Sequence, residues 1–382
     1  MTTTLDFTTV HPQMSPMVPG KLPALAATGP RREAPLPARI QASYTTRFVA
    51  SAVEKTPQDF HLLAGGDITP TPGDVVIARI SHISNHKRVE TPESRKAVLF
   101  DGALVMLAYG HRYAADQFLA HVPDSLDHCH LVAAGGIAGV VTELHDRMKE
   151  PTEIEPLGLL ATTDGGVVNV RDFAAFDNPL VVGAPQQRPK VIAVLGTSMN
   201  SGKSTTLACL VNGLTAAGQQ VAAGKITGTG AGNDRMLYHD AGAHRVVDFT
   251  DFGYPTTFRM NFAEIRALTV NMINTLSAGS DTVIVEIADG IYQGETARLL
   301  RDELFQECVD SVVFSAVDAL GAKAGAEELI KAGLKVSAAA GVMTASPLAT
   351  AEACEVLGTL GVPVIATYAL TAPEVATGVV EF

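Results

Sequence analysis

One segment, residues 191–206, constrains the fold more than any other part of the chain. It reads Val-Ile-Ala-Val-Leu-Gly-Thr-Ser-Met-Asn-Ser-Gly-Lys-Ser-Thr-Thr. An apolar strand runs into a polar loop that starts and ends with glycine. A helix follows, with apolar residues at i, i+3, i+4 and i+7 from Leu207. This strand–loop–helix order, with Gly-Lys-Ser at the helix start, is typical of a phosphate-binding loop.

The loop predicts a nucleotide site because its backbone N–H groups and the positive end of the helix can surround a polyphosphate. Lys203 would reach the outer phosphates as a catalytic residue, and the Ser204 hydroxyl would be a Mg²⁺ ligand. Five residues separate Gly196 from Gly202, one more than in the usual loop, so Thr197 stands where the first glycine is expected. The predicted cofactor-binding residues are Gly196, Thr197, Ser198, Met199, Asn200, Ser201, Gly202, Lys203, Ser204 and Thr205.

The C-terminal half of the chain has the pattern of an α/β domain. Continuous apolar runs of this length indicate strands that are buried on both faces, as in a parallel sheet covered by helices. We therefore expect a doubly wound, mostly parallel sheet in a P-loop domain over residues 190–382. The runs are 191–195, 221–226, 283–287, 312–316, 336–340 and 364–366.

The N-terminal half has a different pattern. Residues 39–185 contain short apolar runs broken by turns, such as 47–53 and 74–83, and predict a smaller β-rich (α+β) domain. We expect one or two helices in it, with one at Tyr113–His121. Residues 1–38 are rich in proline and predict an arm, either mobile or laid over a neighbouring subunit, and residues 186–189 look like a linker.

Charged residues follow two of the predicted buried strands in the C-terminal half. Glu286 ends the strand 283–287, where a carboxylate beside the phosphate loop would contact the metal or its water shell. Asp289 is assigned to the substrate or the attacking group as a catalytic residue. The alternative is that Asp289 caps the helix after Gly294. Asp234 is a candidate second Mg²⁺ contact, or else an exposed turn aspartate.

Lys225 closes the second strand and would project over the crevice where open α/β sheets bind ligands, so it is the third predicted catalytic residue. The polar segment 248–257 either faces an acceptor substrate or forms a satisfied turn network. No Asn-Lys-x-Asp or Thr-Lys-x-Asp motif for reading guanine follows a late strand, which favours ATP over GTP. The base would lie near residues 341–347.

On these residues the chain resembles known families. Gly-Thr-x5-Gly-Lys-Ser is similar to the loop of dethiobiotin synthetase and its relatives, within the P-loop class that includes cobyrinic acid amidases and partition ATPases. The segments 224–229, 233–234 and 240–243 also look like those of molybdopterin-guanine dinucleotide adaptor proteins. The resemblance covers about residues 190–370. It implies a glutamate at the position of Glu286 and an acceptor-contacting lysine at the position of Lys225.

Charge and composition argue against a nucleic-acid partner and a membrane partner. The net charge is −12 and Lys and Arg are not clustered, so a nucleic-acid partner is not expected. No apolar run is long enough to cross a bilayer, and the N-terminus lacks a secretion pattern, so we expect a cytoplasmic protein without a membrane partner. The four cysteines are scattered, as in a reducing compartment. We also expect a homo-oligomer.

The sequence leaves three functional hypotheses. The first is a Mg²⁺-dependent ATP-binding enzyme, a kinase or a ligase, that transfers or activates a phosphoryl group on a small-molecule acceptor. The second is a nucleotide-gated adaptor in cofactor biosynthesis, suggested by the adaptor-like segments. The third is a polynucleotide 5′-kinase, suggested only by a β-rich domain that precedes a P-loop domain.

Overall fold

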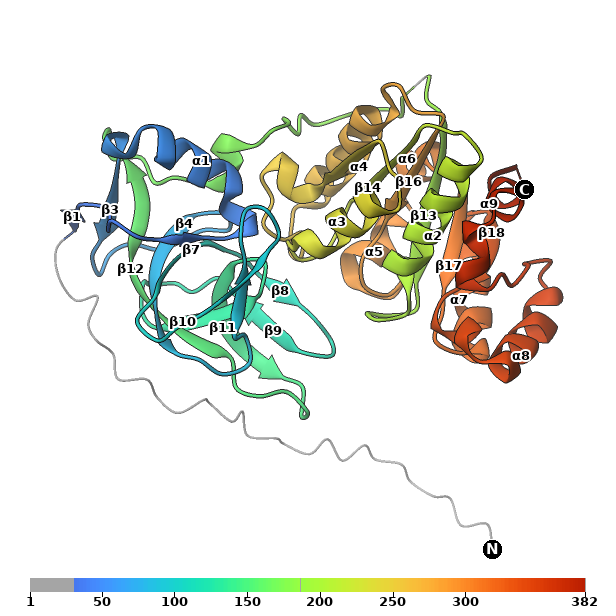
Figure 1. Ribbon diagram of the computed structural model, residues 1–382, viewed down its shortest axis with the longest axis horizontal. Coiled ribbons are helices and arrows are strands. Elements are labelled where there is room, and N and C mark those ends of the chain that lie inside the picture. Colours follow the sequence, from blue (N-terminus) through green and yellow to red (C-terminus); the bar gives the residue numbers. More distant parts are fainter. Residues whose placement is uncertain (1–30, 186, 382) are drawn as a thin grey trace, which may run out of the picture.

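The computed structural model describes residues 31–185 and 187–381, which form two lobes joined by an extended connection (Figure 1). The N-terminal lobe contains a 10-stranded sheet and a separate 2-stranded hairpin, and the C-terminal lobe contains a 6-stranded sheet. None of the described helices has the length and apolarity needed to span a membrane.

The N-terminal lobe consists mainly of strands. Its strands are β1 (Arg32–Ala34), β2 (Gln41–Ala42), β3 (Phe60–Ala64), β4 (Val75–His82), β5 (Arg88–Glu90), β6 (Lys96–Val98), β7 (Leu104–Tyr109), β8 (Arg112–Tyr113), β9 (Phe118–His121), β10 (Cys129–Ala133), β11 (Ile137–Leu144) and β12 (Thr152–Thr162), and its α-helix is α1 (Arg47–Lys55).

The C-terminal lobe alternates strands and helices. Its strands are β13 (Lys190–Gly196), β14 (Val221–Lys225), β15 (Arg245–Asp248), β16 (Thr282–Glu286), β17 (Ser311–Ser315) and β18 (Val336–Ala340). Its α-helices are α2 (Lys203–Ala216), α3 (Gly232–Asp240), α4 (Phe262–Ser277), α5 (Gly294–Leu299), α6 (Glu303–Cys308), α7 (Ala319–Lys331), α8 (Pro347–Gly358) and α9 (Pro373–Glu381).

The strand pairings of the N-terminal lobe close into a small barrel. β4 pairs with β7, β7 with β11, β11 with β10, β10 with β12, and β12 with β4 again. Of these pairs only β7 with β11 is parallel. The apolar side chains that the ring encloses, such as Val76, Leu107 and Leu131, are fully buried. This lobe is therefore the β-rich domain that its short apolar runs indicate.

The helix prediction in this lobe was wrong, and one apolar run counted toward its β-rich pattern is helical. Tyr113–His121 is not a helix but the hairpin β8–β9, in which Phe118 and Ala120 are buried while Leu119 and His121 are half-buried. This alternation with a period of two is that of a strand. Pairing of β9 with β11 stabilises the extended conformation and outweighs the helix propensity of the alanines in this segment. The apolar run 47–53 belongs instead to the helix α1, which packs Val49 and Ala50 against the sheet.

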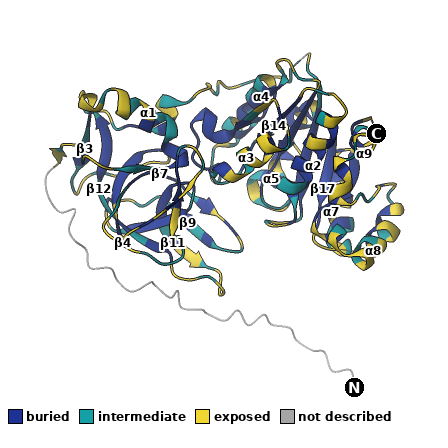
Figure 2. Ribbon diagram, viewed as in Figure 1, coloured by how far each residue is buried: buried dark blue, intermediate teal, exposed yellow. Residues whose placement is uncertain are grey.

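The C-terminal lobe is a doubly wound α/β fold, as the sequence predicts. Its strands lie in the order β15-β14-β16-β13-β17-β18 and every pair is parallel. Along β13, Val191, Ala193 and Leu195 belong to one apolar core and Ile192 and Val194 to the other. Helices α2, α3 and α9 cover one face and α4 to α8 the other, so the strands are buried between them (Figure 2).

One predicted strand is absent and one strand was missed. Residues 364–366 form only an isolated parallel bridge between Val364 and Ala339. The edge strand β15, which pairs with β14, takes its place as the sixth strand. Its sequence, Arg-Val-Val-Asp, is short and polar at both ends, as suits a sheet edge.

The predicted arm and linker are described in part. Residues 1–30 and Gln186 lie outside the described residues. Within the predicted arm, Arg32–Ala34 forms the strand β1, which pairs antiparallel with β3. Within the predicted linker, Arg188 forms an ion pair of 2.5 Å with Asp310.

Glycine allows the backbones of the two lobes to approach closely. A Cβ atom on Gly135 would lie 1.8 Å from the Gly230 carbonyl oxygen, and one on Gly232 would lie 1.9 Å from the Ser94 hydroxyl. Any larger residue would force the lobes apart. Glu90 of the N-terminal lobe accepts a hydrogen bond of 2.7 Å from the Gly232 N–H and so caps the start of α3. The β14–α3 loop is thus held directly against the barrel.

Candidate functional site

The predicted phosphate loop connects β13 to α2 at the carboxyl edge of the central strand. Gly202 (φ 97°) and Asn200 (φ 62°) adopt the left-handed conformation that such a loop needs. The Thr197 N–H donates to the Ser315 carbonyl at 3.0 Å, and the Val342 N–H donates to the Ser201 carbonyl at 3.1 Å, which anchors the loop to β17 and to the turn after β18. Among the described residues, the buried hydroxyls of Thr197 and Ser201 have no hydrogen-bond partner. The loop is a polar cradle at a helix N-terminus.

Lys203 is the first residue of α2 and lies buried beside this cradle. Its Nζ donates to the Ser198 carbonyl at 2.8 Å, so the side chain runs back along the loop. Burial lowers the pKa of Lys203, whereas the negative charges of Glu286 and Asp289 act to raise it. The lysine therefore faces the same acidic residues that the sequence assigns to the site.

A network of charged side chains lies at the ends of β14 and β16. Lys225 and Glu286 are register partners on adjacent strands, and Lys225 Nζ lies 3.2 Å from Glu286 Oε1. Asp234 of α3 makes a second ion pair with Lys225, and the Tyr238 hydroxyl donates to Glu286. Burial alone would lower the pKa of Lys225, but the charges of Glu286 and Asp234 raise it above its ordinary value. Lys225 is charged at neutral pH.

Asp234 connects this network to the phosphate loop. Burial acts to raise the pKa of Asp234, but the charge of Lys225 and a hydrogen bond with Ser204 lower it below its ordinary value. Asp234 lies in the first turn of α3 and its side chain is only 25% exposed, so the alternative of an exposed turn aspartate was wrong. The structure brings Ser204, Asp234 and Glu286 together around Lys225.

Asp289 lies where the chain leaves β16 beside the loop. It has a φ of 62°, and the next residue, Gly290, approaches so closely that a Cβ atom there would lie 2.4 Å from the Thr197 carbonyl oxygen. Burial raises the pKa of Asp289, with Lys203 and Lys225 acting in the opposite sense. The alternative that Asp289 caps α5 was wrong, because the cap is Gln293, whose side chain accepts from the Thr296 N–H.

The oxygen ligands suit a Mg²⁺ that arrives with a nucleotide. The Ser204 hydroxyl and the Asp234 and Glu286 carboxylates are the ligand types that Mg²⁺ prefers. Both carboxylates are, however, shared with Lys225. In the part of the chain that the structure describes, no group of three or more His, Cys, Asp or Glu side chains could hold a metal by itself. The residues therefore fit a metal that is bound mostly by phosphates and water.

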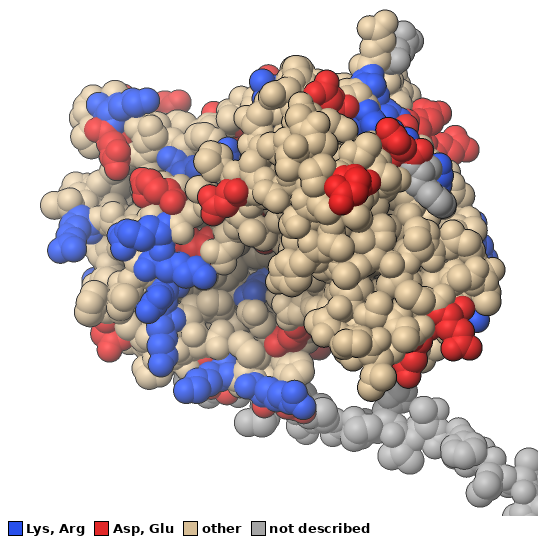
Figure 3. Space-filling model, turned by 45° about the vertical axis from the view of Figure 1, so that its right-hand side comes forward, with Lys and Arg blue, Asp and Glu red and all other residues tan. Residues whose placement is uncertain are grey.

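The hairpin β8–β9 of the N-terminal lobe reaches this site. Asp116, in the turn of the hairpin, accepts a hydrogen bond from the Asn200 side chain in the phosphate loop. Tyr113 packs on Phe258, with ring centroids 5.5 Å apart. On the face drawn in Figure 3 the surface is hollowed between the two lobes, and basic side chains lie in the hollow and beside it. The site is therefore built from both lobes, which the sequence did not indicate.

A narrow pocket lies between the hairpin and the end of β16. Its interior has room for about one water molecule. Carboxylates, hydroxyls and two aromatic rings line it, and no Lys or Arg is among its lining residues. These are Tyr113, Thr227, Gly228, Thr229, Thr257, Phe258, Ala288, Asp289, Gln293, Glu295 and Thr296.

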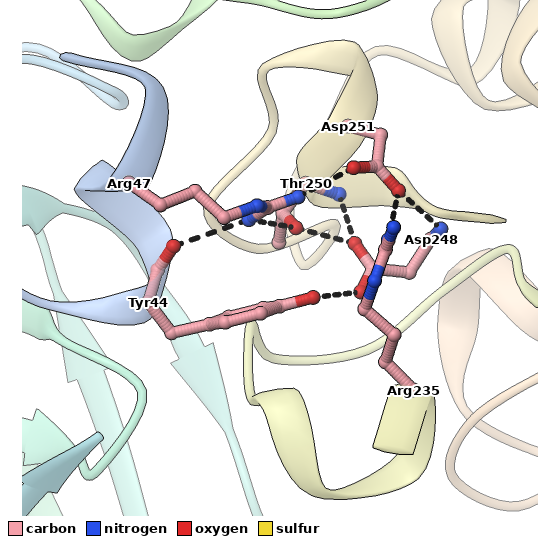
Figure 4. Close-up of polar contacts among 6 residues, drawn as sticks. All are labelled: Tyr44, Arg47, Arg235, Asp248, Thr250 and Asp251. Atoms are coloured by element: carbon pink, nitrogen blue, oxygen red, sulfur yellow. Dashed lines mark hydrogen bonds and ion pairs between the residues drawn. The ribbon is translucent and has the colours of Figure 1, made fainter. Parts of the chain in front are cut away.

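The acids of the segment 248–257 form a polar network between the lobes (Figure 4). The Tyr44 hydroxyl donates to Asp248 at 2.5 Å, and Arg47 Nη2 donates to Asp251 at 2.6 Å. Asp251 also accepts from Arg235, the neighbour of Asp234 on α3. Of the two readings of this segment, a satisfied turn network therefore describes Asp248 and Asp251. Thr257, at the end of the same segment, lines the pocket instead. The cluster needs residues some 200 positions apart in sequence, so no local pattern could reveal it.

The segment 341–347, the expected base-binding region, lies next to the phosphate loop. A Cβ atom on Gly202 would lie 3.1 Å from the Gly341 Cα atom, and one on Gly341 would lie 2.5 Å from the Ser201 carbonyl oxygen. Val342 is 45% exposed and Leu348 is 80% exposed. An apolar surface therefore adjoins the loop on this side.

No family model and no curated protein matches the chain. Solved structures resemble part of it. The signal recognition particle receptor FtsY from Elizabethkingia anophelis, in complex with GDP, is 16% identical with a TM-score of 0.36, over 55% of this chain and 69% of that chain. The signal recognition particle 54 kDa protein from Aeropyrum pernix K1, also in complex with GDP, is 21% identical with a TM-score of 0.36, over 56% of this chain and 52% of that chain. FtsY from Thermotoga maritima is 16% identical with a TM-score of 0.33, over 55% of this chain and 74% of that chain.

The fold assignment follows from the chain itself. A six-stranded parallel sheet with helices on both faces carries a Gly-Lys-Ser loop at the end of a central strand. The C-terminal lobe is therefore a P-loop nucleotide-binding fold.

Proposed function

We propose that the protein is a Mg²⁺-dependent ATP-binding enzyme that transfers or activates a phosphoryl group on a small-molecule acceptor. The main support is the meeting of Lys203, Lys225 and the carboxylates of Asp234, Glu286 and Asp289 at one edge of the sheet. Phosphoryl transfer is catalysed mainly by positioning and by neutralising charge. A lysine beside the loop and acids for a metal serve that purpose.

Each residue then has a separate task. The loop N–H groups and Lys203 hold the phosphates, and Lys225 keeps the carboxylates of Asp234 and Glu286 oriented toward Ser204. Ser204, with Asp234 and Glu286, would hold Mg²⁺, which supplies charge neutralisation at the phosphates when bound. The barrel hairpin and the glycine-lined contact between the lobes restrict water at the site.

Asp289 is suited to accept a proton from the acceptor. Burial raises the pKa of Asp289, which makes its carboxylate a stronger base. The residue also lines the pocket beside the loop. The pocket needs to widen for an acceptor to enter, which a shift of the β8–β9 hairpin would allow. Tyr113 and Phe258 would then contact the apolar part of the acceptor.

The direct test is turnover by the full chain and by Lys203→Ala. ADP formation from MgATP should fall roughly 100-fold or more in the variant. A matched control, Lys323→Ala on the exposed surface of α7, should keep the rate of the wild-type protein. Equal rates for wild type and Lys203→Ala would contradict the proposal.

A nucleotide-gated adaptor is the second candidate, and one observation favours it. Neighbouring side chains of α3 point to two different places: Asp234 binds Lys225 at the nucleotide site, and Arg235 binds Asp251 at the contact between the lobes. Such a helix could pass a change at the nucleotide to the N-terminal lobe. An adaptor would bind MgATP without acceptor-dependent ADP formation, whereas the enzyme would form more ADP with its acceptor present.

A further inference from the structure

Arg112, in β8 of the N-terminal lobe, is a buried arginine with unused hydrogen-bond donors. The residue is only 6% exposed. Its Nη2 donates to Gln117 Oε1 at 2.7 Å, but its buried Nε and Nη1 have no hydrogen-bond partner among the described residues. Buried arginines are almost always paired, because an uncompensated charge away from water is costly. The unused donors therefore call for a partner that is not a side chain of this lobe.

The position of Arg112 points to the nucleotide site. Its bond to Gln117 directs the guanidinium along the hairpin toward the turn. The preceding residue of that turn, Asp116, is hydrogen-bonded to Asn200 in the phosphate loop. The guanidinium therefore lies near the junction between the hairpin and the loop.

The charges around Arg112 do not neutralise it. Burial lowers the pKa of Arg112 to about 10, and the charge of Asp289, across the site, acts in the opposite sense. The neighbouring His86 has a pKa lowered to about 4 by burial and by Arg112, so it is neutral at pH 7. The Phe118 ring, 5.7 Å from Arg112 Cζ, offers only its π face. A positive charge is thus held next to the phosphate loop without a contacting carboxylate.

We infer that Arg112 binds an oxyanion at the junction of the β8–β9 hairpin and the phosphate loop. The oxyanion is either the phosphoryl group being transferred or a carboxylate of the acceptor, since arginine recognises both through charged hydrogen bonds. The guanidinium is covered, so binding requires the hairpin to shift, and the Asp116–Asn200 contact is the link that can move. The inference rests on the proposed function and assigns the N-terminal lobe a residue in the reaction.

Calorimetry on the full-length protein tests this with two probes. MgADP with aluminium fluoride stands in for the transferred phosphoryl group, and malonate added to the MgADP complex stands in for an acceptor carboxylate. In Arg112→Gln, affinity for MgADP alone should stay unchanged, and affinity for one of the two probes should fall at least tenfold. The affected probe identifies the oxyanion. Arg112→Lys should recover part of the loss, and Arg39→Gln, which removes an exposed arginine of the same lobe, should have no effect.

Different results would contradict the role of Arg112 and the proposed function. If wild type binds MgADP but Arg112→Gln binds both probes as wild type does, or wild type binds neither probe, the role of Arg112 is overturned. If wild type does not bind MgADP at all, the proposed function fails as well.

A thermal melt distinguishes binding from a structural role. An arginine whose charge is unpaired should be replaceable by methionine without a fall in Tm, whereas an arginine that stabilises the hairpin should not. The effective probe should raise the Tm of wild type and leave that of Arg112→Met unchanged. A large fall in Tm for Arg112→Met, with an equal response to the probe, would overturn the inference.

Discussion

Lys225 Nζ lies 3.2 Å from Glu286 Oε1, at the carboxyl ends of two adjacent parallel strands. Their side chains are 15% and 2% exposed, so the pair is well shielded from water. Asp234 shares the same ammonium group. Lys225 is therefore both a candidate acceptor contact and the residue that holds two candidate metal-binding carboxylates in place.

Replacing Lys225 should destabilise the protein. Lys225→Met leaves Glu286 and Asp234 buried without their cation, and breaking a buried pair costs about 3–5 kcal/mol in free energy of unfolding. Urea denaturation of wild type and variant measures the difference. The double variant Lys225→Met/Glu286→Gln should recover part of the loss, because it removes one of the two stranded charges. A single variant within about 0.5 kcal/mol of wild type would contradict this assignment.

Asp251 should control how firmly the two lobes are joined. It is 3% exposed and accepts from Arg47 of α1 in the N-terminal lobe and from Arg235 of α3 (Figure 4). Asp251→Asn keeps the size of the side chain but removes the negative charge that both arginines contact, and leaves only Asp248 near Arg235. We expect a loss of roughly 3 kcal/mol and faster proteolysis in the connection 174–189. Asp240→Asn, an exposed acid on the same helix as Arg235, is the control and should behave as wild type.

Stability should fall as the pH decreases from about 6.5 to 4. Burial lowers the pKa of His130 to about 4 from 6.5, so between these values the unfolded chain binds a proton that the folded chain does not. His86 and His111, with pKa values also lowered to about 4, act in the same sense. Glu90 and Asp289, whose pKa values burial raises, act in the opposite sense.

A single variant isolates this effect. His130 Nδ1 accepts from the Val141 N–H at 3.1 Å, and glutamine can also accept there without titrating. The free energy of unfolding of His130→Gln, measured in urea at pH 7.5 and pH 5, should change less with pH than that of wild type. His239→Gln, at an exposed position, should retain the wild-type dependence. An identical dependence for His130→Gln and wild type would refute the shift.

The sequence was sufficient where a short-range pattern determines the structure. Strands β13, β14, β16, β17 and β18 could be predicted because each is a continuous apolar run, and the phosphate loop because its residues are contiguous. The grouping of Lys225, Asp234 and Glu286 with Ser204 followed because the carboxyl ends of parallel strands meet at one sheet edge.

Long-range contacts explain what the sequence did not reveal. The hairpin β8–β9 looked helical because its pairing partner, β11, lies farther along the chain. Asp116, Tyr113 and Arg112 gave no signal as site residues, since their relation to the phosphate loop depends on how the lobes pack. Glycines such as Gly135 and Gly230 could be read as turns but not as the contact between lobes that they form.

Isothermal titration of the full chain with MgATP, and in parallel with MgGTP, tests the central claim most directly. If the β13–α2 loop is a triphosphate cradle with Lys203 at its mouth, wild type should bind MgATP with measurable heat and more tightly than MgGTP, and Lys203→Ala should lose most of that affinity while melting at a similar temperature. No heat with either triphosphate in wild type, or equal affinity for MgATP in Lys203→Ala, would contradict the account.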